Sequence, residues 1–160
     1  MADVVADAIL AATGGGEGGA VAAFTNTGGV RAGLLYERQA GGERPGDVTF
    51  EEVYAVQPFG NDLVVKTCHG QDLYDALEQQ FDNPDPGAVQ MLAVSANVRY
   101  RWRGADRPHI PEGALTINGL AVDPSAVYRV GVNSFVADGG DGFTVFRDRC
   151  TDLSLIHISE

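Results

Sequence analysis

Three glycines surround one aspartate near the end of the chain, in the sequence Gly139-Gly140-Asp141-Gly142. Glycine adopts positive φ without steric cost and lets a backbone or a ligand approach closely, so this run predicts a tight loop that presents the Asp141 carboxylate. A strand-like run at 127–132 leads to Phe135 ahead of the loop, and a second β-type run at 143–146 follows it. Phe135 and Asp141 together suit a flat, hydroxyl-bearing ligand, whose ring would stack on the phenyl group while a sugar diol bonds to the carboxylate. The spacing fits a hairpin with core aromatics equally well.

The composition is that of a globular domain with an acidic balance. Of the 160 residues, 44% are hydrophobic, which is enough for one domain with a real core. The formal net charge of −11 disfavours a nucleic-acid polymer or an anionic membrane surface as a partner, although a few arginines can still hold a small anion locally. No apolar run is long enough to span a bilayer, and no signal peptide is visible at the start.

The cysteines and histidines show no recognisable site. Cys68 and Cys150 lie far apart in the sequence, so a disulfide is neither implied nor excluded. His69, His109 and His157 share no metal-ligand spacing with the cysteines or with an aspartate pair. We therefore expect neither a structural zinc site nor a dimetal centre in this chain.

The first part of the chain reads as a helix and a strand. Residues 2–13 place apolar side chains at helical spacing and precede a glycine-rich run at 14–19, so we expect an amphipathic helix followed by a loop. This helix has no element before it, and we expect the native chain to extend upstream. Residues 20–25 form a short apolar run bounded by turn formers, which is the pattern of a buried strand.

Glycines and one cation follow this strand directly, in the sequence Asn26-Thr27-Gly28-Gly29-Val30-Arg31. Small residues at the end of a buried strand leave backbone N–H groups free to face an anion, and Arg31 can add a charge-assisted contact. The alternative is a plain strand-to-helix turn with a solvated arginine.

A third candidate segment follows a short helix. Residues 49–56 begin with a capping box, in which a threonine is followed three residues later by a glutamate, and Pro58 prevents the helix from continuing. Phe59 is thereby placed on a turn, followed by Gly60 and Asn61. An aromatic ring and a side-chain amide together can supply a stacking face and a hydrogen bond to the edge of a flat ligand. Phe59 could instead fill the core where the helix ends.

The middle of the chain alternates strands and helices. Residues 62–68 read as a strand, residues 71–81 as a helix, and residues 91–102 as one or two strands. The dipeptide Asn118-Gly119 between β-type residues predicts a two-residue hairpin. The final residues, 153–160, resemble the translation of a common sequencing adaptor, so we treat them as a non-native tail and leave them out of the fold. We expect the native C-terminus to be missing as well.

Three motifs in one order on one chain carry a family resemblance: residues 26–31, the sequence Gln57-Pro58-Phe59-Gly60-Asn61, and residues 135–143. Over residues 2–150 the sequence resembles the C-terminal domain of the 5′-nucleotidase family. The resemblance implies a single α+β (mixed α/β) domain over residues 1–152, with a mixed sheet and packed helices. In that family this domain binds the nucleoside part of a nucleotide, and a separate N-terminal metallophosphoesterase domain carries two divalent metal ions and performs the hydrolysis.

The resemblance also implies a role for each motif residue. In these roles Phe59 and Phe135 clamp the base, Asn61 or Asn26 contacts its edge, Asp141 binds the ribose hydroxyls and Arg31 binds a phosphate. The supporting glycines are Gly28, Gly29, Gly60, Gly139, Gly140 and Gly142. Stacking tolerates different bases, so we expect broad nucleotide specificity.

The resemblance thus implies the substrate-binding domain of a secreted, periplasmic or cell-surface 5′-nucleotidase, a phosphohydrolase of nucleotide catabolism. The parent would be an enzyme, with the N-terminal domain as a partner in cis. This chain should hydrolyse nothing by itself, because the metals and catalytic residues belong to the other domain. Alternatives are a stand-alone, non-catalytic nucleotide-binding or surface-interaction module, and the equivalent domain of a UDP-sugar hydrolase or cyclic-nucleotide phosphodiesterase. A sulfur-compound hydrolase is disfavoured because its small substrate offers nothing to stack on.

Overall fold

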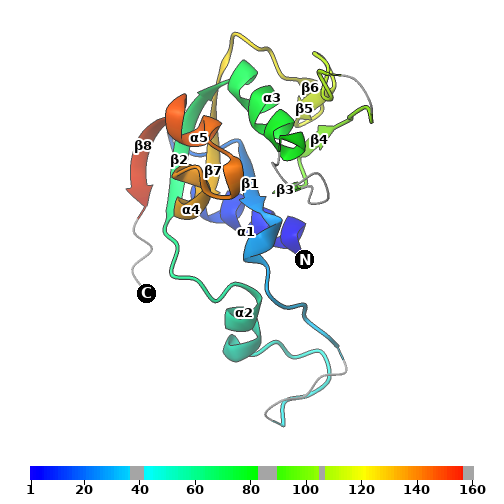
Figure 1. Ribbon diagram of the computed structural model, residues 1–160. Helices are drawn as coiled ribbons and strands as arrows, with labels where there is room; N and C mark the ends of the chain where they lie inside the picture. The colour runs from blue at the N-terminus through cyan, green and yellow to red at the C-terminus, as the bar shows by residue number, and fades with distance from the viewer. Residues whose placement is uncertain (37–41, 83–89, 105–106, 157–160) are drawn as a thin grey trace.

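The described residues form one mixed sheet with helices packed on it, a second small sheet, and one helix that stands apart (Figure 1). The computed structural model describes residues 1–36, 42–82, 90–104 and 107–156, with only the backbone for residues 153–156. The strands are β1 (Ala22–Asn26), β2 (Leu63–His69), β3 (Leu92–Val94), β4 (Val98–Tyr100), β5 (Leu115–Ile117), β6 (Leu120–Ala121), β7 (Val127–Asn133) and β8 (Thr151–Ile156). The α-helices are α1 (Ala2–Thr13), α2 (Phe50–Val56), α3 (Gly70–Glu78), α4 (Ser134–Ala137) and α5 (Val145–Asp148), and the 3-10 turns are η1 (Thr27–Gly29), η2 (Gln79–Phe81) and η3 (Gly140–Gly142).

The main sheet has five strands in the order β3-β1-β7-β2-β8. Its centre is the parallel pair β1 and β7, in which Ala22 lies opposite Val130. The other neighbours, β3 on β1, β2 on β7 and β8 on β2, are antiparallel. Strand β1 is buried along its whole length, as expected for a strand covered on both faces. The predicted α+β class with a mixed sheet is confirmed.

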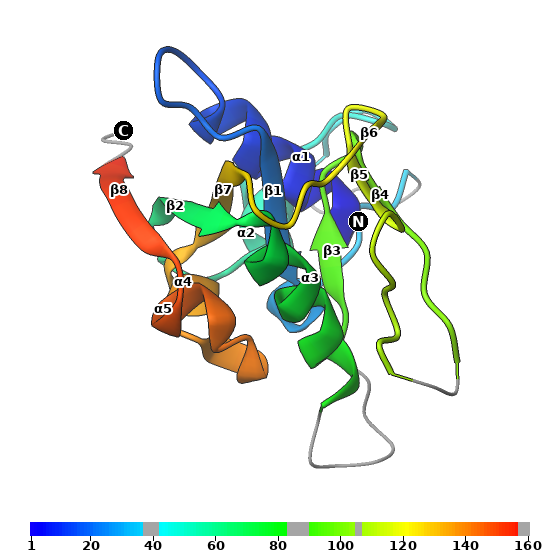
Figure 2. The same cartoon turned by 90° about the horizontal axis from the view of Figure 1, so that it is seen from above.

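Helices cover both faces of this sheet, with α1 on one side and α3, α4 and α5 on the other (Figure 2). Helix α1 comes close to β7 because Gly131 has no side chain: a Cβ there would overlap the hydroxyl of Thr13. On the opposite face the main core contains Phe24 and Phe146, whose ring centroids lie 5.9 Å apart. Helix α2 stands away from the sheet at the end of a long connection (Figure 1).

Several local predictions are confirmed. The helix over 2–13 is α1. The capping box is present at α2, where Thr49 Oγ1 accepts a hydrogen bond from Glu52 N (3.3 Å) and Thr49 N donates to Glu52 Oε2 (2.9 Å). The hairpin joins β5 to β6, and both central residues have positive φ, 52° at Asn118 and 78° at Gly119. Positive φ at both positions is what a type I′ turn requires.

The prediction of a β-type run at 143–146 is wrong, because this segment enters α5. Phe143 and Phe146 are both fully buried. Phe143 lies two residues before α5 and Phe146 lies within it, and Phe146 N donates a hydrogen bond of 3.4 Å to the carbonyl oxygen of Phe143. In a strand, residues three apart point to opposite faces, whereas this turn lets both rings enter the same core. The requirement comes from tertiary packing, which a four-residue apolar run does not reveal.

Leaving residues 153–156 out of the fold is also wrong, because their backbone belongs to β8, where Leu63 of β2 lies opposite Ile156. Without β8, β2 would be the edge strand of the sheet, and its N–H and C=O groups on that side would be unpaired and open to any segment able to extend beside it. Residues 157–160, including His157, lie outside the described residues, and the non-native origin of the tail stays a prediction.

The open question of the cysteines is answered by a disulfide between Cys68 at the end of β2 and Cys150 just before β8. Both residues are buried, with exposed fractions of 1% and 6%. The bridge therefore joins the two strands inside the main core.

In the described part of the chain, no helix is both long and apolar enough to cross a membrane.

Candidate functional site

The sheet topology brings the three sequence motifs to one place. Strands β1 and β7 are parallel neighbours, so their carboxyl ends, Asn26 and Asn133, lie at the same edge of the sheet. Strand β2 runs antiparallel to β7, and its first residue, Leu63, lies opposite Asn133. The loop after β1, the turn before β2 and the loop after β7 therefore meet at this edge.

A cavity of about 270 Å³ lies where these loops meet. It is lined by Asn26, Gly28, Gly29, Arg31, Phe59, Asn61, Phe135 and Asp141. The structure thus gathers every side chain predicted for the site around one cavity, together with two of the supporting glycines. Gly60, Gly139, Gly140 and Gly142 are not among the lining residues.

Two half-exposed phenylalanine rings form walls of this cavity. Phe59, on the turn before β2, is 45% exposed, and Phe135, in α4, is 43% exposed. Neither ring is a core residue, whereas Phe143 of the same loop is fully buried. Interpreting Phe59 or Phe135 as core is therefore wrong. Large aromatic side chains left half-exposed in a concave site offer faces for stacking.

The ring of Phe135 rests against the glycine loop. A Cβ on Gly140 would overlap this ring, so the position of Phe135 requires glycine at 140. Gly140 thus affects the cavity indirectly, by leaving room for the Phe135 ring that lines it.

Asp141 occupies a backbone conformation that few residues with a side chain adopt, with a φ of 54°. Gly139 and Gly142 on either side have φ values of 85°. Asn26 Nδ2 donates a hydrogen bond of 2.8 Å to Asp141 Oδ2, and this bond joins the loop after β7 to the end of β1. No hydrogen bond from the described residues reaches the other oxygen, Oδ1, so the carboxylate has acceptor capacity left for a ligand.

Arg31 lies at the rim of the cavity and is exposed. Its Nη1 donates to the carbonyl oxygen of Gly28 at 3.3 Å, and its Cζ lies 5.8 Å from the centroid of the Phe59 ring, within cation–π range. None of the ion pairs among the described residues involves Arg31. A guanidinium with no carboxylate partner at the mouth of a cavity is suited to bind an anionic group.

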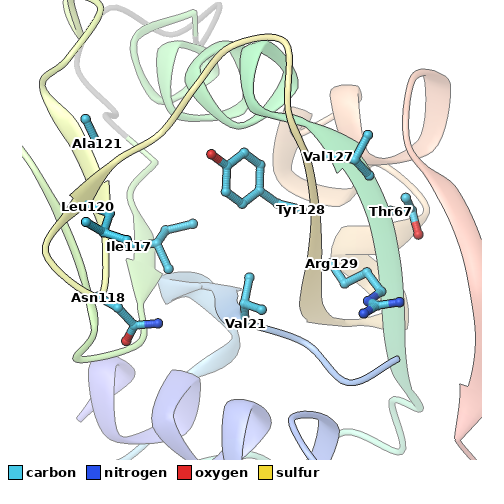
Figure 3. A pocket seen from close by; sticks show the side chains of 9 residues that line it. All are labelled: Val21, Thr67, Ile117, Asn118, Leu120, Ala121, Val127, Tyr128 and Arg129. Atoms are coloured by element: carbon cyan, nitrogen blue, oxygen red, sulfur yellow. The ribbon is translucent and has the colours of Figure 1, made fainter. Parts of the chain in front are cut away.

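A larger cavity of about 660 Å³ lies at the opposite end of the same strands, where β7 begins and β2 ends (Figure 3). Its lining is mostly apolar, and the ring of Tyr128 points into it (Figure 3). The Tyr128 hydroxyl accepts a hydrogen bond of 2.9 Å from Asp123 N. None of the predicted site residues lines this cavity, and nothing there combines stacking faces with a carboxylate.

Residues 1–36, 42–82, 90–104 and 107–156 hold no group of three or more His, Cys, Asp or Glu side chains placed to bind a metal ion together.

Comparison with known families decides the classification. The family described as 5′-nucleotidase, C-terminal domain, matches residues 1–148. The chain belongs to this family. The resemblance inferred from the three motifs is thereby confirmed for nearly the whole chain.

Relatives of this 5′-nucleotidase C-terminal domain are much longer proteins. The trifunctional nucleotide phosphoesterase YfkN of Bacillus subtilis is 34% identical over 92% of this chain, which spans 10% of YfkN. The cell wall protein Lmo0130 of Listeria monocytogenes is 32% identical over 78% of the chain, which spans 15% of that protein. The crystal structure of a 5′-nucleotidase precursor from Thermus thermophilus matches with a TM-score of 0.74 and 31% identity, covering 95% of this chain and 29% of the other.

Sequence reasoning did not single out Asn133, which contacts residues on both sides of this 5′-nucleotidase domain site without lining the cavity. It lies behind the cavity wall, where Asn133 Oδ1 accepts a hydrogen bond of 2.8 Å from Val136 N at the start of α4. An asparagine at the end of a predicted strand, just before a helical turn, is a preferred N-cap, and that signal was available. The sequence pattern predicts a loop between two strands after Asn133 and so leaves this cap without a helix to begin.

Proposed function

We propose that the chain is the substrate-binding domain of a 5′-nucleotidase-type phosphohydrolase and that it holds the nucleoside base between Phe59 and Phe135. The observation that carries this proposal is the pair of half-exposed rings, remote in sequence, on the walls of one 270 Å³ cavity. Stacking between aromatic side chains contributes about 1 to 3 kcal/mol per base. A hydroxyl-rich ligand also suits the carboxylate of Asp141 in the same cavity.

The hydrogen bonds favour one division of roles between the two asparagines. Asn26 Nδ2 is bound to Asp141, and its Oδ1 accepts from Asn133 Nδ2 at 3.2 Å. Asn61 lines the cavity and has no side-chain hydrogen bond among the described residues. We therefore assign the base edge to Asn61, and the support of the ribose-binding carboxylate to Asn26.

Hydrolysis is proposed to take place in another part of a longer protein, at two divalent metal ions held by an N-terminal domain in cis. Support comes from the length of the relatives, of which this chain spans only 10% to 29%. In such an enzyme this domain would bind the nucleotide and bring its phosphate to the metals by a hinge motion.

The parent protein is proposed to act outside the cytoplasm, in nucleotide catabolism. The relative in Listeria monocytogenes is named a cell wall protein. The buried disulfide between Cys68 and Cys150 agrees with this location, because disulfides persist in oxidising compartments.

Calorimetric titration of the 160-residue chain tests the binding function. Adenosine and uridine should both bind, because stacking does not depend on base identity. Ribose 5-phosphate, which has no base to stack, should bind much more weakly. The proposal is wrong if neither nucleoside binds, or if ribose 5-phosphate binds as tightly as AMP.

Replacement of Arg31 should reveal the phosphate subsite. In Arg31→Gln we expect AMP to bind about fivefold more weakly, near the upper limit for an exposed ion pair, and adenosine affinity to change little. Raising the salt concentration should reduce the difference in AMP affinity between the unsubstituted chain and Arg31→Gln, since exposed charge pairs are screened. Titrations with AMP and adenosine at two salt concentrations measure both effects. Equal losses for AMP and adenosine would place Arg31 at the base instead of the phosphate.

A further inference from the structure

A buried asparagine connects the two walls of the cavity without lining it. Asn133, the last residue of β7, is 2% exposed. Its Oδ1 accepts from Val136 N, and its Nδ2 donates to Asn26 Oδ1 and to Thr25 Oγ1, both at 3.2 Å. One side chain thus reaches the helix on one side and the end of β1 on the other.

The first of these contacts fixes which way the amide of Asn133 faces. Asn133 is the N-cap of α4, and a cap must present an oxygen to the free N–H groups at the helix start. With Oδ1 on Val136 N, the amino group necessarily points the other way, toward Asn26. The polarity of the helix end therefore sets the orientation of this side chain.

The second contact passes this orientation on to Asp141. Because Asn26 Oδ1 accepts from Asn133, its Nδ2 is the end that faces the carboxylate, at 2.8 Å from Asp141 Oδ2. A flipped Asn26 would set a carbonyl oxygen against a negative charge. Asn26 is 5% exposed, so water has little access to compensate for that repulsion.

We propose that Asn133 is a positioning residue for the ribose subsite, acting on Asp141 through Asn26. This assignment rests on the proposed function, because it takes Asp141 as the group that binds the sugar hydroxyls. Asn133 touches no ligand in this scheme. It determines how firmly the carboxylate is held for the diol, and therefore how strongly the site prefers ribose over a sugar without hydroxyl groups.

The substitution Asn133→Ser separates the two contacts. Serine is also a favoured N-cap, so the start of α4 and the position of Phe135 should be retained. Its side chain is too short to reach Asn26, so the connection to Asp141 is lost. We expect the preference for adenosine over 2′,3′-dideoxyadenosine to fall by about tenfold, the worth of one hydrogen bond to a charged group. Affinity for dideoxyadenosine should stay within about twofold, because stacking is untouched.

Asn133→Asp is a second variant that keeps the size of the side chain and the cap. In this variant a carboxylate oxygen replaces Nδ2 and repels Asn26 Oδ1, which favours the flipped orientation of the Asn26 amide. The preference for adenosine over 2′,3′-dideoxyadenosine should therefore fall at least as far as in the serine variant. Thermal unfolding followed by circular dichroism shows which variants are folded. The aspartate variant provides the same measurement if the serine variant does not fold.

Thr25→Val is the matched control. It removes the other acceptor of Asn133 Nδ2, on a residue that is fully buried, but leaves the contact to Asn26 in place. This variant should lose stability and keep its preference for adenosine. If Asn133→Ser weakens both ligands equally, or weakens neither, the positioning role is wrong while the proposed function stands. Failure of the unsubstituted chain to bind either nucleoside would overturn both.

Discussion

Alanine at position 135 is expected to weaken adenosine binding by about tenfold or more, and alanine at position 59 should do the same. The physical reason is the loss of one stacking face, worth about 1 to 3 kcal/mol per base. Phe59 and Phe135 are 45% and 43% exposed, so neither substitution leaves a cavity in the core. Affinity should therefore fall without a comparable fall in the free energy of unfolding. Calorimetry and thermal unfolding of the same samples measure the two quantities.

The chain offers a matched control for this prediction in Phe50. It is 82% exposed on α2, stacks on Tyr54 with ring centroids 6.3 Å apart, and does not line the cavity. Phe50→Ala removes the same group from the surface and should leave adenosine affinity unchanged. The clamp is contradicted if both Phe59→Ala and Phe135→Ala bind adenosine as tightly as the unsubstituted chain does. A fall in adenosine affinity in all three alanine variants would indicate a general effect of losing exposed aromatic side chains.

Patterns within a few neighbouring residues correctly predicted the structural elements that contacts between those residues determine. A capping box begins α2 because Thr49 and Glu52 satisfy each other's backbone groups, and Asn118-Gly119 turns β5 into β6 because both residues accept positive φ. Tertiary structure decided the cases that failed. The backbone of residues 153–156 became a strand because the edge of β2 was open to it, and no property of that segment alone specifies this neighbour.

The candidate site likewise combines features that local sequence predicts with features that depend on tertiary structure. Each motif indicated its own chemistry, such as an exposed ring at Phe59 or a carboxylate held by glycines at Asp141. That these residues share one cavity follows from the parallel pairing of β1 with β7 and from the antiparallel pairing of β2. Pairing between segments so remote in the sequence cannot be derived from periodicity, and only the family resemblance anticipated it. Asn133 was missed because its importance lies in hydrogen bonds made across this same sheet edge.

Opening the disulfide is expected to cost about 4 kcal/mol of unfolding free energy. Cys68 and Cys150 are separated by 82 positions, and a cross-link that closes so long a loop removes much of the conformational freedom of the unfolded chain. For a domain of this size, the loss corresponds to a fall of about 10 °C in the unfolding temperature. Thermal and urea unfolding with and without dithiothreitol measure it.

The loop closed by this bridge contains Phe135 and Asp141. The bridge lies at the end of β2, whereas the cavity lies at the beginning of β2. Reduction should therefore lower stability and leave the adenosine affinity of the folded chain unchanged. A variant with both Cys68→Ala and Cys150→Ala is the control, since its unfolding midpoint should not respond to dithiothreitol. An unchanged midpoint in the unsubstituted chain would show that the bridge adds no stability. A selective loss of affinity on reduction would show that it also shapes the site, because the loop would then need the cross-link to bring Phe135 and Asp141 to the cavity.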